Sequence, residues 1–271
     1  MELSVIITTY NKEIWLQKVL EGYANQSEQN FEVIIADDGS NSNTKHIIDS
    51  FQNRFIHPIQ HIWQEDNGFQ KCKILNKAIL KSTTDYLLFT DGDCIPRFDF
   101  VAQHLKNKEK GYFLSGGYFK LPMSVSEKIS LNDIKNQNCF SISWLIKNNV
   151  SKSFKLTKLT RNILFAKLMN CITPTKKTFN GHNTSCYKED ILAVNGFNEE
   201  MQYGGLDREL GERLLNNGLK SKQIRYSAIC IHLEHERIYA SIENWKKNNE
   251  IRNYNQKHKI TKIEKGISQY L

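Results

Sequence analysis

The distribution of apolar and polar residues divides the chain into two contrasting parts. From residue 3 to residue 90, short apolar runs alternate with stretches in which apolar residues recur at helical spacing. The strand-like runs cover residues 3–9, 31–36, 59–63 and 86–90, and the helical patterns include residues 14–20 and 72–79. Strands that alternate with helices in this way form a parallel sheet, because each helix carries the chain back to the start of the next strand. We therefore predict an α/β fold with a doubly wound, mostly parallel sheet.

The second part of the chain is less regular. The pattern predicts helices over residues 98–105, 189–194 and 206–214, strands over 112–117, 181–187 and 222–231, and a terminal helix that frays after residue 241. Between residues 121 and 178, five apolar residues recur at helical spacing, namely Leu156, Leu159, Ile163, Ala166 and Met169. A helix over residues 156–169 would either lie on anionic lipid or pack its apolar face on the domain.

The composition is that of an ordinary globular protein. A chain of 271 residues with 39% apolar residues holds one large α/β domain or two small ones. Residues 1–4 show no basic and apolar leader, and no uncharged apolar stretch reaches the roughly 18 residues that span a bilayer. The expected location is therefore the cytoplasm. Six cysteines without a Cys-x-x-Cys pair argue against a zinc or disulfide framework.

Positive charge is concentrated in one segment of the chain. The net charge is +8, yet residues 134–188 contain ten Lys or Arg residues and no Asp or Glu. Such a block suggests an anionic partner, which could be a membrane surface, a phosphorylated acceptor or nucleic acid.

The apolar run at residues 86–90 ends in Asp91-Gly92-Asp93. A sheet does not bury two unpaired carboxylates, so both acids should lie just past the carboxyl end of the strand. Gly92 permits a tight turn there, and hard oxygen donors suit Mg²⁺ or Mn²⁺ carrying phosphate oxygens. A surface turn is the alternative, since Asp and Gly are common turn residues.

Three other polar segments lie at the same edge of the predicted sheet. They are Thr8-Thr9-Tyr10-Asn11, Asp37-Asp38-Gly39-Ser40 and the glycine-rich segment from Gly204 to Glu209. Open α/β sheets bind ligands at the carboxyl ends of their strands. Together with Asp91-Gly92-Asp93, these segments resemble the family 2 glycosyltransferases of GT-A fold, over residues 1–120 and 180–240.

The resemblance implies a single GT-A domain over residues 1–240 that moves a sugar from a nucleotide-sugar to an acceptor. Within it we expect a nucleotide-sugar-binding half at residues 1–120, a basic insertion at 121–178 and an acceptor-binding half at 179–240. A basic C-terminal helix or tail follows at residues 241–271.

The resemblance also assigns roles to residues on the donor side. The donor-binding positions are Thr8, Thr9, Tyr10, Asn11, Asp38 and Asp91, with Thr8 and Asp38 at the nucleobase and ribose. Lys71 or Lys73 would face the diphosphate, although a solvated helix face explains either lysine equally well. Asn183 would contact the donor sugar or the acceptor.

A metal site and a catalytic base complete the assignment. The implied ligands of Mn²⁺ or Mg²⁺ are Asp91, Asp93, His232 and His235. Asp93 would bind directly, Asp91 mainly through ribose or water, and either histidine could complete the site. Asp207 would be the general base that removes the acceptor proton, with inversion at the anomeric carbon. This part of the chain resembles a galactosyltransferase-type C-terminal motif. Many relatives with that motif carry Glu before this Asp where this chain has Leu206, which leaves the hydrogen bonding of the acceptor open.

The sequence thus predicts an inverting, metal-dependent glycosyltransferase that favours a UDP-sugar and works peripherally on the inner face of the cell membrane. Its acceptor would be a saccharide or lipid-linked molecule of surface polysaccharide or lipooligosaccharide synthesis. One alternative is a nucleotidyltransferase, which should carry a glycine-rich, basic phosphate loop that residues 8–13 lack. The other is a non-catalytic nucleic-acid-binding protein, which would leave the clustered carboxylates unexplained. We therefore expect no nucleic acid partner.

Overall fold

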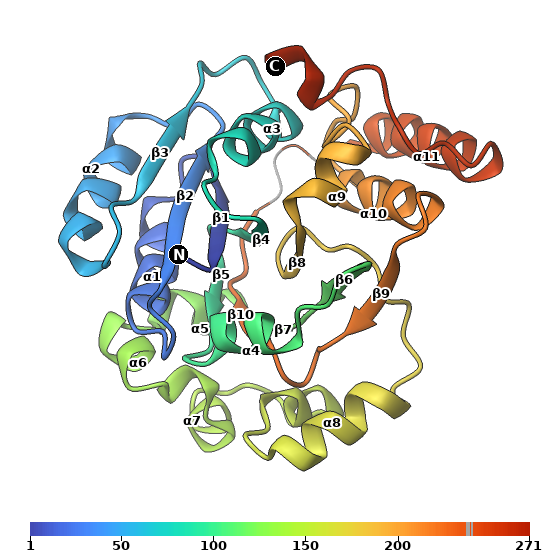
Figure 1. Cartoon of the computed structure of the whole chain (residues 1–271). Helices are drawn as coiled ribbons and strands as arrows, with labels where there is room; N and C mark the ends of the chain where they lie inside the picture. The colour runs from blue at the N-terminus through green and yellow to red at the C-terminus, as the bar shows by residue number, and fades with distance from the viewer. Residues whose placement is uncertain (237–238, 240) are drawn as a thin grey trace.

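The structure of the protein is a computed structural model that describes residues 1–236, 239 and 241–271 (Figure 1). Its main sheet has seven strands in the order β3-β2-β1-β4-β8-β6-β9. In that order the strands are β3 (Gln60–Trp63), β2 (Phe31–Asp37), β1 (Leu3–Thr9), β4 (Tyr86–Asp91), β8 (Thr184–Tyr187), β6 (Tyr112–Ser115) and β9 (Lys220–Gln223). The first four run parallel, as do β6 and β9, whereas β8 is antiparallel to both of its neighbours. The predicted α/β fold with a mostly parallel, doubly wound sheet is confirmed.

Helices cover both faces of this sheet. Successive strand residues point to opposite faces, so apolar residues of one strand pack against helices on both sides. Val5 and Ile7 of β1 belong to one buried cluster and Ile6 to another. The first cluster includes residues of α1 (Glu13–Ala24), α2 (Ser42–Phe51) and α4 (Phe100–Asn107). The second includes residues of α3 (Lys71–Lys81), α9 (Lys188–Ala193), α10 (Leu206–Asn216) and the 3-10 helix η4 (Ile267–Tyr270). A short 3-10 helix, η1 (Gln52–Arg54), follows α2.

A second, three-stranded sheet adjoins the first and was not predicted. Its strands are β5 (Cys94–Pro96), β10 (Ile229–His232) and β7 (Gly117–Lys120), in that order. The predictions of one strand over residues 112–117 and one over 222–231 are wrong. Each segment contains the end of a main-sheet strand, β6 or β9, and the start of a strand of the second sheet, β7 or β10. The chain leaves the main sheet at Gly116, where a Cβ would lie only 2.0 Å from Asn183 Oδ1. No residue larger than glycine fits at that crossing without displacing Asn183.

The basic segment forms short helices, and in Figure 1 α7 and α8 lie below the small sheet whereas α5 and α6 lie to its left. They are α5 (Met123–Lys128), α6 (Leu131–Lys135), η2 (Asn138–Phe140), α7 (Ile142–Lys147), η3 (Phe154–Leu159) and α8 (Ile163–Ile172). The prediction of one helix over residues 156–169 is wrong. Thr160 is not helical, with ψ of 141°, and its carbonyl accepts a hydrogen bond from Arg97 Nη1 (2.8 Å). The Asn162 side chain then accepts from the backbone N–H of Phe165 and starts α8 as a new helix.

The predicted terminal helix is present as α11 (Ile242–Lys257), but it is docked rather than frayed. The Asn248 side chain is fully buried and donates to the carbonyl of Gly204 at 2.7 Å. Asn255 donates to Glu209 Oε1 of α10 at 2.8 Å. These bonds hold α11 against α10 and the loop that leads into it. Among the helices described, none is both long enough and apolar enough to cross a bilayer.

Candidate active site

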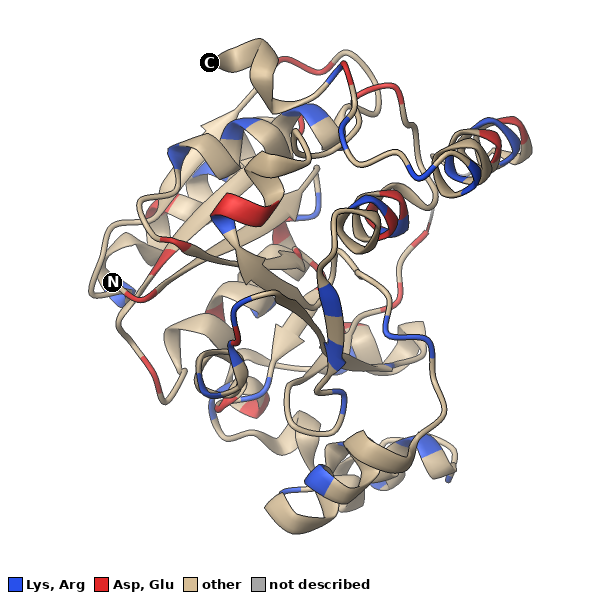
Figure 2. Cartoon of the chain, turned by 45° about the vertical axis from the view of Figure 1, so that its right-hand side comes forward, with Lys and Arg blue, Asp and Glu red and all other residues tan. Residues whose placement is uncertain are grey.

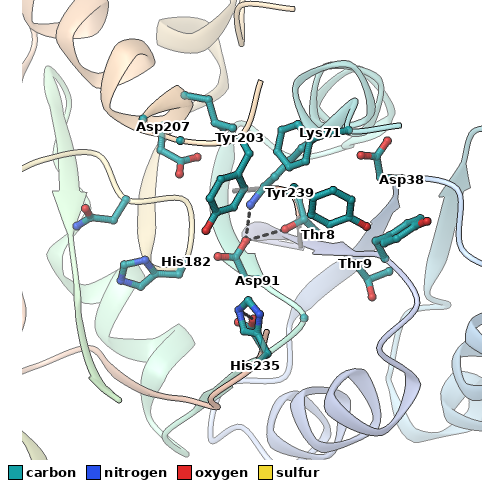
Figure 3. A pocket seen from close by; sticks show the side chains of 18 of the residues that line it. Thr8, Thr9, Asp38, Lys71, Asp91, His182, Tyr203, Asp207, His235 and Tyr239 are labelled. Carbon is teal, nitrogen blue, oxygen red and sulfur yellow. Dashed lines mark hydrogen bonds and ion pairs between the residues drawn. The ribbon is translucent and has the colours of Figure 1, made fainter. Parts of the chain in front are cut away.

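A cavity of about 460 Å³ lies at the carboxyl ends of β1, β2 and β4. The segments that lead into α3, β8 and α10, the first turns of α3 and α10, and the end of β10 with the residues that follow it line the rest of the cavity. In Figure 3, Thr9 and Asp38 lie on one side of this cavity and Asp207 and His182 on the other, with Asp91 between them. This edge of the sheet is where open α/β folds bind ligands.

Asp91 forms the floor of the cavity and is bonded to two other groups. Thr8 stands opposite Asp91 in the pairing of β1 with β4, and its Oγ1 donates to Asp91 Oδ1 at 2.7 Å. Lys71 Nζ, from the first turn of α3, donates to the same oxygen at 2.6 Å. Burial alone would raise the pKa of Asp91, but the Lys71 ammonium outweighs burial and holds this pKa below its ordinary value. Burial alone would lower the pKa of Lys71, yet Asp91 and Asp207 raise it. The floor therefore carries a carboxylate and an ammonium at neutral pH.

The wall next to β2 is polar. Asp38 is buried and accepts a hydrogen bond from Gln64 Nε2 at 2.7 Å, and burial raises the pKa of this carboxyl. Thr9 also lines this wall, and the Tyr10 hydroxyl donates to Asp66 Oδ2 at 2.8 Å. A carboxylate and hydroxyls in this arrangement can bond to a base N–H or to ribose hydroxyls.

Asp93 lies beside two histidines. Its Oδ2 is 2.9 Å from His235 Nε2, and its Oδ1 is 3.9 Å from His232 Nε2. Burial alone would raise the pKa of Asp93, but the His235 hydrogen bond and the charge of His232 hold this pKa well below its ordinary value. The hydrogen bond in turn raises the pKa of His235. Ligand atoms of Asp93, Cys94 and His232 all lie within 4.8 Å of one another.

His182 adds a third imidazole at this end of the cavity. Its ring centroid is 6.3 Å from that of His232. Burial lowers the pKa of His182 to about 4, so the ring is neutral at physiological pH. Two ring nitrogens, His182 Nε2 and His232 Nδ1, are buried without a hydrogen-bond partner among the described residues. A carboxylate beside imidazoles with unpaired nitrogens is a donor set that suits Mn²⁺ and accommodates Mg²⁺, so these residues fit a divalent metal ion.

Asp207 faces the floor from the opposite wall. Gly204 and Gly205, with φ of 109° and 79°, lead the chain into α10 and place Asp207 in its first turn. A Cβ on Gly181 would lie 2.4 Å from Asp207 Oδ1, so only glycine permits this approach. Asp207 Oδ1 is buried without a partner among the described residues, and burial raises the pKa of the carboxyl. A carboxylate with an unused oxygen and a raised pKa is suited to remove a proton.

Three residues named from the sequence lie outside the cavity. Asn11 Oδ1 accepts from the backbone N–H of Asn41 and joins the turns after β1 and β2. Lys73 lines a separate, smaller cavity. Asn183 is fully buried, and its Nδ2 donates to the Gly117 carbonyl at 2.7 Å where the two sheets meet. Its neighbour in sequence, His182, is the residue that lines the cavity.

Several aromatic residues that line the cavity carry no predicted role. The Phe69 ring contacts the rings of Tyr203 and Tyr239, with centroids 5.7 and 5.6 Å away, and Trp245 covers Gly204. Flat aromatic faces of this kind can pack against a base or a sugar ring. Residue type alone does not separate such side chains from core aromatics, and the chain positions from 69 to 245 give no common motif.

Comparison with known proteins identifies the family. The model of glycosyl transferase family 2 matches residues 4–192. The chain belongs to this family. A second model, the N-terminal domain of galactosyltransferase, matches residues 163–236, the part of this glycosyltransferase that contains Asp207 and His232.

Relatives and solved structures agree with this assignment. Chondroitin synthase of Escherichia coli is 27% identical over 250 residues, which are 86% of this chain and 34% of the relative, so the glycosyltransferase spans about a third of that protein. The structure of S. aureus TarS in complex with UDP-GlcNAc gives a TM-score of 0.62 at 16% identity and covers 96% of this chain and 69% of that one. The mannosyltransferase PcManGT from Pyrobaculum calidifontis, in complex with GDP-Man and Mn²⁺, gives 0.57 at 17% identity, over 88% and 58%. The glycosyltransferase has their GT-A fold.

Proposed function

We propose that this glycosyltransferase moves a sugar from a nucleoside-diphosphate sugar, with UDP as the favoured nucleotide, to a saccharide or lipid-linked acceptor. The reaction depends on Mn²⁺ or Mg²⁺ and inverts the anomeric carbon. The observation that carries the proposal is that Asp207 lies across one cavity from Thr8, Asp38 and the Asp91 floor. The complexes of TarS with UDP-GlcNAc and of PcManGT with GDP-Man support the donor class, and the likeness to chondroitin synthase supports a role in polysaccharide synthesis. We place that role in surface polysaccharide or lipooligosaccharide synthesis.

The donor is held from the β1 and β2 side of the cavity. Thr8, Thr9 and Asp38 offer oxygens to the nucleobase and ribose, and the diphosphate extends toward Lys71. Lys71 stays protonated beside Asp91 and contributes positive charge there. The sugar then lies between the floor and Asp207.

The residues that would hold a metal ion are Asp93 and His232, with His235 or His182 completing the set and Asp91 acting through ribose or water. A bound ion of this kind supplies Lewis-acid neutralisation of the charge on the departing diphosphate. Asp93 lies beside His232, the last residue of β10, and bonds to His235 just after it. The three side chains are therefore adjacent, as a shared metal ion requires.

Asp207 acts on the acceptor. Its carboxylate removes the proton of the acceptor hydroxyl, whose oxygen forms a bond to the anomeric carbon. The bond from that carbon to the diphosphate oxygen breaks, and its electron pair leaves with the nucleoside diphosphate. Because base and leaving group lie on opposite sides of the sugar, the configuration inverts.

A panel of nucleotide-sugars tests the donor assignment. With Mn²⁺ present, a UDP-sugar is expected to raise the melting temperature, because a ligand that binds only the folded state at 100 times its Kd adds about 2.7 kcal/mol of stability. Thermal unfolding across UDP-, GDP- and CMP-sugars, followed by hydrolysis assays, measures this. Nucleoside triphosphates serve as the control, and pyrophosphate release from one of them would instead favour a nucleotidyltransferase. Stabilisation by no nucleotide-sugar would contradict the proposal.

We also propose that the enzyme works on the cytoplasmic face of the membrane, bound peripherally through α8. Ala166 and Met169 of this helix are buried against Tyr226, and Asn170 bonds to the backbone N–H of Tyr226. Its outer face is apolar and exposed, with Leu164 77% accessible. The exposed apolar residues of α8 are Ile163, Leu164, Phe165, Leu168 and Ile172. At the bottom of Figure 2 the chain around α8 carries Lys and Arg and no Asp or Glu, as anionic lipid requires.

Vesicle binding tests the role of α8. Leu164→Glu is expected to weaken binding to phosphatidylglycerol vesicles at least about 10-fold, since it removes about 1.5–3 kcal/mol of apolar burial and adds a repelled charge. Ile56→Glu, at an exposed apolar position on the loop after η1, is the matched control and should bind like the wild type. Co-sedimentation with vesicles of phosphatidylglycerol or phosphatidylcholine measures both. Equal loss in the two variants, or no lipid binding by the wild type, would rule out this surface.

A further inference from the structure

A second cavity of about 770 Å³ adjoins the active site on the side of Asp207. The two cavities share walls formed by Tyr118, Phe179, Asn180 and Arg208. Asp207 lines the active-site cavity, and Arg208, the next residue in the first turn of α10, lines both cavities. The second cavity therefore lies beside the base.

The second cavity is lined by cationic side chains. Six Lys or Arg residues line it, namely Lys158, Lys176, Lys177, Arg208, Arg225 and Arg252. They come from η3, the segment after α8, the start of α10, the turn between β9 and β10, and α11. Five separate parts of the chain thus bring positive charge to one concave surface. A solvated helix face would draw its charges from one element instead.

These cations are not matched by carboxylates of the cavity. Among the described residues that line it, Glu212 is the one carboxylate, and it already accepts two hydrogen bonds from Arg252 (2.5 and 3.2 Å). Arg225 donates from Nη2 to the carbonyl of Lys176 at 2.7 Å. Its Nε is buried with no hydrogen-bond partner in the part of the chain that the structure describes. A partly buried guanidinium without an anionic partner is costly, so the site is incomplete without one.

Lys158 shows the same imbalance. It is half-buried beside Arg225, and burial, followed by the charges of Arg225 and Lys155, lowers its pKa. Burial likewise lowers the pKa of Arg225. An oxyanion between the two would relieve both the repulsion and the unpaired Nε, because carboxylate and phosphate accept charge-assisted hydrogen bonds from guanidinium and ammonium groups.

We propose that the second cavity is the acceptor groove and that the acceptor is an anionic saccharide chain. Its charged groups, uronate carboxylates or phosphodiesters, bind Lys158 and Arg225 while a neighbouring hydroxyl reaches Asp207. This inference rests on the proposed sugar transfer, since it assigns the substrate class of the same site. It is independent of lipid binding, because α8 contributes none of the cations of the groove.

Direct binding without donor tests the groove. The probes are three labelled oligosaccharides of equal length: a hyaluronan oligomer (uronate), a ribitol phosphate oligomer (phosphodiester) and a maltooligosaccharide (neutral). The wild type is expected to bind one anionic probe at least about 10-fold more tightly than the neutral probe, with an affinity that falls as salt rises. Which of the two anionic probes binds more tightly identifies carboxylate or phosphate as the recognised group.

The double variant Lys158→Gln/Arg225→Gln is expected to lose this preference, with anionic binding reduced about 10- to 100-fold and neutral binding little changed. The matched control is Lys135→Gln/Lys147→Gln, which removes the same charge from the acid-free segment outside the groove. Each variant is first shown to keep the wild-type melting temperature. If the double variant does not fold, the single variant Arg225→Lys, which keeps the positive charge, is measured in its place.

Three results would overturn the inference: no preference of the wild type for anions, equal loss in the control variant, or tighter binding of a generic RNA oligomer than of either anionic saccharide. Failure of the proposed function is seen separately. It would appear as no stabilisation of the wild-type protein by any nucleotide-sugar with Mn²⁺, whatever the anionic probes do.

Discussion

Asp207→Asn is expected to lower the rate of sugar transfer about 10³-fold, within the range that a general base contributes. The amide has nearly the same shape as the carboxylate but cannot take the proton of the acceptor hydroxyl. Gly181 leaves room for the side chain. Asp207 Oδ1 accepts no hydrogen bond from the described residues, so the substitution breaks no hydrogen bond to this oxygen. Transfer to a saccharide acceptor at saturating donor and Mn²⁺ measures the loss, and donor-induced thermal stabilisation should persist.

Asp190→Asn is the control for this change. Asp190 also lies in the first turn of a helix, α9, and burial also raises its pKa, but it lies outside the cavity. In the wild type, transfer should fall as acid protonates Asp207, and the raised pKa moves this loss to a higher pH than an ordinary aspartate would give. Retention of more than a tenth of the transfer rate in Asp207→Asn would remove this residue from the role of base.

The donor side of the fold could be predicted because its signals are local. The runs that became β1, β2 and β4 are mostly apolar, and each ends at a polar turn within the next few residues. Parallel pairing then brings the ends of these strands together, so Thr8 and Asp91 meet in register. No long-range information is needed for that step.

The second sheet could not be predicted in the same way. Its strands β5, β7 and β10 have three or four residues each, and two of them follow a main-sheet strand after a short break. An apolar run shows no sign of where a strand changes sheets. The crossing depends on Gly116 passing against Asn183, a contact between residues far apart in sequence.

The same limit applies to the site. His182 and Asn183 are adjacent and both polar, and only the structure separates the residue that lines the cavity from the one that joins the sheets. The cationic groove has no motif, because its lysines and arginines come from segments between residues 158 and 252. The acid-free segment indicated an anionic partner, but Arg208, Arg225 and Arg252 lie beyond it.

Asp93→Asn is expected to lower transfer at least about 10²-fold and to raise the concentration of Mn²⁺ needed for half-maximal activity. Asparagine keeps the shape but loses the negative charge, and neutral amide oxygens bind divalent ions more weakly than carboxylates. Isothermal titration of Mn²⁺ into the protein with UDP, together with transfer rates across a range of Mn²⁺, measures both effects. Asp85→Asn, an exposed residue just before the other end of β4, is the control.

A measurement without metal separates loss of charge from loss of structure in this variant. The Asp93 carboxylate raises the pKa of His235 through their 2.9 Å contact, so the pKa of His235 should fall in Asp93→Asn and stay unchanged in Asp85→Asn. NMR titration of the His235 ring in metal-free protein detects this shift. A lowered His235 pKa with an unchanged melting temperature and full activity at low Mn²⁺ would mean that Asp93 contacts the histidines but does not bind the metal. A lowered pKa with activity restored only by high Mn²⁺ would make Asp93 a ligand, because its charge then affects both the pKa of His235 and the binding of Mn²⁺.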